Sequence, residues 1–131
     1  MTNLQDAEFI VLDVLKDFIK EFLYLNGGIK LRAVLKDNSF IDIYLNPLEE
    51  NSFSFHFQCK DGRVFRLDTY PGEKRAKTLS TYPVHLHYEN QNSVIEPPFK
   101  VERNSLDNLR NFLEFITEIL NVKLTDREVD E

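Results

Sequence analysis

The sequence predicts an α+β domain in which two helices cover one face of an antiparallel sheet. Apolar residues recur at helical spacing near both ends of the chain, within Asp6–Leu25 and Ser105–Asn121. Between these segments, several stretches alternate apolar and polar residues, as strands do when one face is buried. Two amphipathic helices need one apolar surface, and such a sheet supplies it. We therefore expect a two-layer sandwich with about five strands, forming one domain over residues 1–131.

The helices are delimited by signals at their ends. The first is expected over Asp6–Leu25, and Asn26-Gly27-Gly28 then supplies the left-handed backbone that commonly ends a helix. Ser105 is a suitable N-cap for the second helix, which we expect to end at Asn121. Residues 125–131 are acidic, and we expect them to be frayed.

The strands follow from alternation between turn residues. The expected strands are Ile29–Lys36, Phe40–Leu45, Ser52–Cys59, Arg63–Tyr70 and Tyr82–Tyr88. Residues 89–98 show no regular pattern and are expected to be irregular.

The turn at Gly62 determines how its two flanking strands pair. A two-residue turn would place His56 opposite Leu67 and would mix polar and apolar side chains on both faces. A three-residue loop that ends in a left-handed Gly62 places His56 opposite Arg66 instead. Because a shift by one residue moves every side chain to the wrong face, we predict the second register.

The face away from the helices should collect the polar side chains of these strands. Its expected members are Lys30, Arg32, Asp42, Tyr44, Ser54, His56, Gln58, Arg66, Asp68, His85 and His87. His85 and His87 are two residues apart, so they should project side by side. The basic residues Lys74, Arg75 and Lys77 lie in the preceding loop and should border this face. We expect the activity of the protein to reside on this open surface.

Composition excludes several classes of protein. No run of 18 apolar residues exists, so no membrane span is expected. The first residues lack the pattern of a signal peptide, and the single cysteine, Cys59, allows no internal disulfide, so we expect a cytoplasmic protein. The net charge of −6 argues against a protein that coats nucleic acid indiscriminately. However, Lys60–Lys77 holds six basic and three acidic residues, a local charge of +3 that can bind a phosphate backbone or an acidic partner.

Three functions fit such a surface. The first is metal-independent binding or cleavage of RNA, with no cofactor. His85, His87 and His56 would supply acid, base or phosphate contacts, since the pKa of a free histidine is about 6.5. The other assignments are Arg66 for charge stabilisation, Asp68 for orienting Arg66, Tyr44 for placing or stacking on substrate, and Lys74, Arg75 and Lys77 for substrate binding.

The other two functions use the same surface differently. The sheet face, or an exposed edge, could bind a partner protein without catalysis. Alternatively, His85 and His87 could bind a metal ion together with His56 or Asp68, as in a metal-dependent hydrolase.

The chain also resembles a known family. The motifs that carry the resemblance are Arg66-Leu67-Asp68 and Pro83-Val84-His85-Leu86-His87, together with the Asp61-Gly62-Arg63 turn and the final helix. In these motifs the chain is similar to the TumE-like toxins, which are toxin partners in type II toxin–antitoxin pairs. The resemblance implies growth inhibition and a cognate antitoxin, and analogy with other small toxins makes RNA the expected target.

The chain departs from the family pattern at one place. After the Arg-x-Asp motif, family members carry Asn, then Pro and two histidines, whereas this chain has Thr69-Tyr70-Pro71-Gly72-Glu73. If that histidine pair takes part in toxicity, this chain is a divergent or inactive relative.

Overall fold

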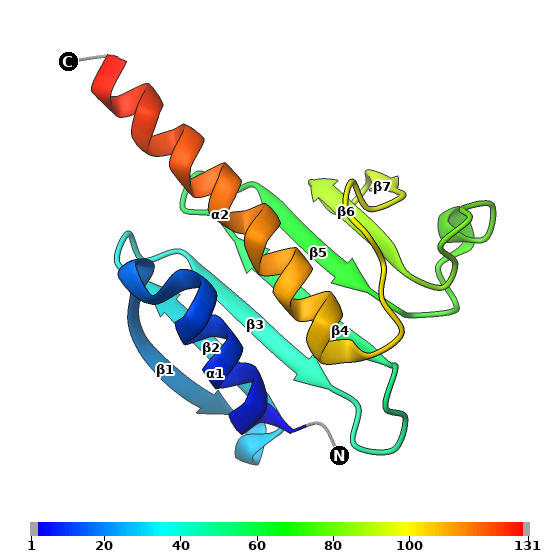
Figure 1. Ribbon diagram of the computed structural model, residues 1–131. Coiled ribbons are helices and arrows are strands. Elements are labelled where there is room, and N and C mark those ends of the chain that lie inside the picture. Colours follow the sequence, from blue (N-terminus) through cyan, green and yellow to red (C-terminus); the bar gives the residue numbers. More distant parts are fainter. Residues whose placement is uncertain (1–2, 130–131) are drawn as a thin grey trace.

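Seven strands form one antiparallel sheet, in the same order in space as along the chain (Figure 1). The computed structural model describes residues 3–129, with side chains described as far as Asn121. The strands are β1 (Ile19–Leu25), β2 (Lys30–Leu35), β3 (Phe40–Leu45), β4 (Phe53–Gln58), β5 (Val64–Asp68), β6 (His85–Glu89) and β7 (Val94–Ile95). The predicted α+β class is confirmed, with two more strands than the five expected.

Both helices cover the same face of the sheet, as predicted (Figure 1). They are α1 (Leu4–Leu15) and α2 (Ser105–Val129), which pack against each other. Asn3 caps α1, because its side-chain oxygen accepts a hydrogen bond from the backbone of Asp6 at 3.0 Å. The helices leave the opposite face of the sheet open.

The second helix differs from its prediction at both ends. Its N-cap is Asn104, whose side chain accepts a hydrogen bond from the backbone N–H of Asp107 at 2.8 Å. The Ser105 hydroxyl instead donates to the carbonyl of Glu50 at 2.6 Å, which ties the helix to the turn before β4. The helix continues past Asn121 to Val129, and residues 130–131 lie outside the described part of the chain.

The predicted first helix, Asp6–Leu25, is wrong in its second half. The helix ends at Leu15, a short 3₁₀ turn covers Lys16–Phe18, and Ile19–Leu25 forms the edge strand β1. The pairing of β1 with β2 is interrupted by a bulge between Ile19 and Glu21. Burial along β1 recurs at every third residue, which is close to helical spacing. The segment at residues 26–28 consequently joins two strands and does not end a helix.

The register at Gly62 is confirmed. Gly62 has a φ of 96°, and its N–H donates to the carbonyl of Cys59 at 3.1 Å. His56 lies opposite Arg66, and Phe57 lies opposite Phe65. A positive φ is readily adopted only by glycine, so this residue fixes which side chains of β4 and β5 share a face.

The core lies between the helices and the sheet. Its largest members include Phe55 and Phe112, which are fully buried with ring centroids 6.1 Å apart. Cys59 is buried in the same core. Within the described part of the chain, no helix combines the length and apolar character needed to cross a membrane.

Candidate functional site

Two rows of polar side chains cross the open face of the sheet. One row contains Arg32, Asp42, His56, Arg66 and His87, each opposite the next on neighbouring strands. The other row contains Lys30, Tyr44, Ser54, Asp68 and His85. The rows arise because alternation on each strand places these side chains on one face, and antiparallel pairing then aligns them across strands.

A hollow of about 480 Å³ lies over the middle of this face. It is lined by Lys30, Arg32, Phe40, Asp42, Tyr44, Ser54, His56 and Arg66. The lining brings together three cationic side chains and one carboxylate, so the hollow is suited to an anionic ligand.

Arg32 and Asp42 form a bidentate ion pair within this hollow. The two guanidinium nitrogens lie 2.7 and 2.9 Å from the two carboxylate oxygens. The guanidinium carbon also stacks over the ring of Phe40, 3.9 Å from its centroid. These contacts fix Arg32 in place and neutralise the only carboxylate in the lining.

Arg66 lies at the border between the hollow and the histidine pair. Its Nη2 donates to Nε2 of His87 at 3.0 Å, and its Nε lies 3.4 Å from a carboxylate oxygen of Asp68. The side chain remains 28% exposed. The predicted orienting role of Asp68 is consistent with this contact, and His87 provides a second contact that holds the guanidinium.

The predicted exposure of His85 and His87 is wrong. Both lie on the expected face with ring centroids 5.0 Å apart, but their exposed fractions are 0% and 2%. The strand β7 pairs alongside β6, and Arg75 in the preceding loop donates to the carbonyl of Asn92 at 2.7 Å in the β6–β7 turn. These segments close over this end of the face, and alternation alone does not reveal them.

His56 is the histidine that lines the hollow. It is half-buried, and its Nε2 lies 3.2 Å from the side-chain oxygen of Gln58. Burial lowers the pKa of His56, the Gln58 contact opposes this shift, and the positive charge of Arg66 adds to it. At neutral pH the ring is therefore mainly uncharged and can accept a proton.

The predicted basic loop divides into two kinds of residue. Arg75 forms an ion pair with Glu73 at 2.9 Å, and this contact lowers the pKa of Glu73 to about 2. Together with its bond to Asn92, this gives Arg75 a structural position. Lys74 and Lys77 are exposed and do not line the hollow.

Among the described residues, one group of three side chains could hold a metal ion, and His56 is not part of it. Ligand atoms of Asp68, His85 and His87 lie within 4.8 Å of one another. His56 does not belong to this group, although it shares the face. The sequence alternatives of His56 or Asp68 as a third ligand are therefore separated by geometry in favour of Asp68.

Lys30, Arg32 and Asp42 line the hollow, although no sequence motif assigns them a particular role. Alternation placed them on the correct face, but nothing in their spacing distinguishes them from other surface charges. The signal that could have found them is the strand order, since β2 and β3 lie directly beside β4.

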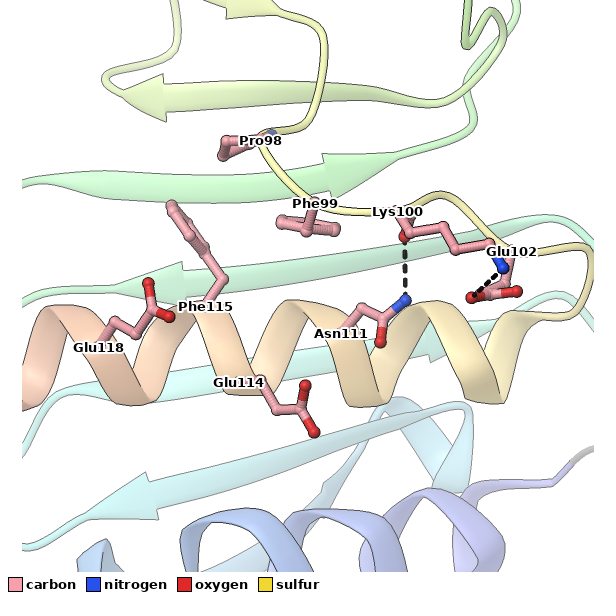
Figure 2. Close-up of a pocket in the computed structure, with 8 residues that line it drawn as sticks. All are labelled: Pro98, Phe99, Lys100, Glu102, Asn111, Glu114, Phe115 and Glu118. Atoms are coloured by element: carbon pink, nitrogen blue, oxygen red, sulfur yellow. Dashed lines mark hydrogen bonds and ion pairs between the residues drawn. The ribbon is translucent and has the colours of Figure 1, made fainter.

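Figure 2 shows a second hollow, on the helix side of the sheet, between α2 and the segment that leads into it. It is about 320 Å³ in volume and contains three glutamates, Glu102, Glu114 and Glu118, with a single cation, Lys100. Asn111 donates to the carbonyl of Lys100 at 2.9 Å and closes one end. None of the predicted site residues lines this hollow, and its acidic character does not suit an RNA backbone.

Comparison with known proteins gives the family of the chain. The family described as Toxin TumE matches residues 7–120, which is most of the chain and includes every residue of the open face. The chain belongs to the TumE toxin family. Comparisons with curated proteins and with solved structures gave no match. The matched range of this TumE-family chain contains both the hollow and the histidine pair.

Proposed function

We propose that this TumE-family toxin acts on RNA at the hollow on the open face of its sheet. The observation that supports the proposal is that one hollow combines three cationic side chains with a neutral imidazole. Cations attract the phosphate backbone, and a neutral imidazole can accept a proton during RNA cleavage.

Arg66 and Lys30 are the proposed phosphate contacts. Lys30 is half-buried and lies opposite Tyr44, while Arg66 keeps part of its guanidinium exposed. Arg32 is held by Asp42 and contributes chiefly to the local positive potential. Tyr44 lies between these cations and offers a ring for stacking against a base.

His56 is the proposed general base. In cleavage of RNA, the 2′-oxygen attacks the adjacent phosphorus and its proton passes to the base. The bond from phosphorus to the 5′-oxygen breaks, which leaves a 2′,3′-cyclic phosphate, and the departing 5′-oxygen takes a proton from water. His56 would accept this proton, and Arg66, which lies opposite it on β5, would stabilise the negative charge on the phosphate.

The buried residue His87 and the half-buried residue Asp68 have a positioning role in this proposal. They contact Nη2 and Nε of Arg66 and so fix the direction of the guanidinium. A pre-oriented arginine loses less side-chain entropy when it binds phosphate. The roles expected for His85 and His87 as surface acid or base are therefore transferred to His56.

The test compares binding with cleavage. The variants His56→Gln and Arg66→Gln are expressed as full chains and assayed for growth arrest and for cleavage of single-stranded RNA. We expect His56→Gln to bind RNA normally and to cleave it at least about 100-fold more slowly. We expect Arg66→Gln to weaken both binding and cleavage, because it removes a phosphate contact.

Lys30→Ala should weaken RNA binding, because it removes the other proposed phosphate contact. Lys100→Ala is its control and should bind RNA normally, because Lys100 is an exposed lysine that lines the other hollow. An RNA with a 2′-deoxy sugar at the cleavage position should bind and stay intact. Growth arrest without any RNA binding would contradict the proposal and would favour a toxin that acts by binding a protein.

The TumE family also implies an antitoxin partner. We expect co-expression of the antitoxin gene adjacent to the toxin gene to relieve growth arrest. Growth arrest that persists when both proteins are present and soluble would contradict this pairing.

A further inference from the structure

The buried pair His85 and His87 presents an arrangement of which the RNA proposal uses only the contact between His87 and Arg66. Nδ1 of His85 lies 2.8 Å from the carbonyl of Pro83, and Nδ1 of His87 lies 3.0 Å from the carbonyl of Gln91. A carbonyl only accepts hydrogen bonds, so both Nδ1 atoms carry the proton. Both rings therefore keep the lone pair on Nε2.

Nε2 of His85 is buried and has no hydrogen-bond partner among the described residues. A buried acceptor without a partner costs free energy, which a bound ligand would recover. The Nδ1 contacts match those of metal-bound histidines, in which the outer nitrogen donates to a carbonyl and orients the ring.

A carboxylate completes the group. Asp68 lies opposite His85 across β5 and β6, and ligand atoms of Asp68, His85 and His87 lie within 4.8 Å of one another. One oxygen of Asp68 accepts a hydrogen bond from the backbone of Tyr70 at 2.8 Å, which fixes the carboxylate. We propose that Asp68, His85 and His87 bind a divalent transition-metal ion. This proposal does not depend on the proposed action on RNA.

The guanidinium of Arg66 competes with a metal ion for this site. Its Nη2 donates to Nε2 of His87, so a cationic group already occupies the position that a metal ion would take. Arg66 is partly exposed and can turn towards the hollow. The metal ion and the guanidinium therefore compete for the same lone pair.

The distances allow coordination after small adjustments. Bonds of about 2.0–2.1 Å to zinc place ligand atoms roughly 3.3 Å apart in a tetrahedral site. The three side chains must therefore close by at most about 1.5 Å, which rotation of their side chains can supply. Two imidazoles and one carboxylate favour Zn²⁺ or Co²⁺ over Mg²⁺, which prefers a shell of oxygens.

The test measures metal binding directly. Full-length protein is freed of metal with a chelator, which is then removed, and Zn²⁺, Co²⁺ and Mg²⁺ are titrated by calorimetry. We expect one Zn²⁺ or Co²⁺ per chain, no binding of Mg²⁺, and a visible absorption band for the Co²⁺ form. The thermal midpoint should rise with Zn²⁺, because a metal that binds the folded chain stabilises it.

Variants assign the ligands. Asp68→Asn and His85→Gln should bind Zn²⁺ at least about 100-fold more weakly, whereas His56→Gln, a histidine on the same face outside the group, should bind normally. Asp68 is only half-buried, so Asp68→Asn keeps the test valid if His85→Gln does not fold. Arg66→Gln should bind several-fold more tightly, because it removes the competing cation.

Two results would overturn the proposal. One is a wild-type protein that binds neither Zn²⁺ nor Co²⁺. The other is metal binding that Asp68→Asn leaves unchanged in a folded variant.

Discussion

Arg66 connects the buried and the open parts of the candidate site. Its guanidinium contacts His87 and Asp68 on one side, and more than a quarter of the side chain is exposed on the other. Its Nε is buried without a hydrogen-bond partner among the described residues and lies 3.4 Å from a carboxylate oxygen of Asp68. A guanidinium held in this way is well oriented for phosphate.

The faces of the site residues could be predicted, but their burial could not. Alternation places His56, His85 and His87 on one face because side chains on a strand alternate with a period of two. Whether a face is covered depends on segments far along the chain, such as the turn contacted by Arg75. This long-range packing has no periodic signal, so two histidines expected at the surface are buried.

The titration of His56 gives a prediction at this scale. Burial lowers its pKa in the folded chain below the ordinary value of 6.5, with Arg66 and Lys30 adding to the shift and Gln58 and Asp42 opposing it. Below about pH 6.5 the unfolded chain binds this proton more readily than the folded chain. We therefore expect the free energy of unfolding to fall as the pH decreases below about 6.5.

The control is His56→Gln, measured by denaturant unfolding over the same range. This variant keeps every other titrating group, so its stability should decline less steeply with acid. Equal slopes for the two proteins would show that His56 is not the group that the fold keeps uncharged.

At the scale of elements, β1 shows where a helical pattern can mislead. Its half-buried residues recur at every third position, close to helical spacing, and a bulge lies between Ile19 and Glu21. Strands β2–β6 pair without a bulge and were predicted within a few residues of their ends. The short strand β7 was missed, because it lies within residues 89–98, which were expected to be irregular.

The turn between β4 and β5 gives a second prediction. Gly62 has a φ of 96°, and a Cβ placed there would meet no atom within 4 Å. The cost of Gly62→Ala therefore comes from the backbone alone. We expect the variant to lose about 1 kcal/mol of stability, measured by denaturant unfolding.

Gly72→Ala is the matched control. Gly72 does not have a positive φ, and a Cβ there would meet the far end of the Tyr70 ring at 2.6 Å. Tyr70 is 63% exposed, so its ring can move away at little cost. A loss of stability as large as that of Gly62→Ala would contradict the conformational explanation.

At the scale of the whole molecule, the arrangement of layers determines where the site lies. Both helices pack on one face, so the opposite face is left for polar side chains (Figure 1). This division was predictable, because two amphipathic helices and one alternating sheet have few other ways to bury their apolar surfaces. The full strand order was not predictable, because only the turn at Gly62 specified a pairing.

The strand order is what assembles the hollow. Because the strands lie side by side in chain order, Lys30 on β2 and Arg66 on β5 line the same hollow. The TumE family match supports a toxin, and the charge of this hollow supports RNA as its target. We therefore expect RNA to contact the open face.

The most direct test is an NMR titration of the isotope-labelled full chain with a single-stranded RNA that carries 2′-O-methyl sugars and resists cleavage. We predict that the amide signals that shift belong to residues of β2–β5 around the hollow, with Lys30, His56 and Arg66 among them. Shifts confined to α1, α2 or the acidic hollow beside Lys100, or no shifts at all, would contradict the account.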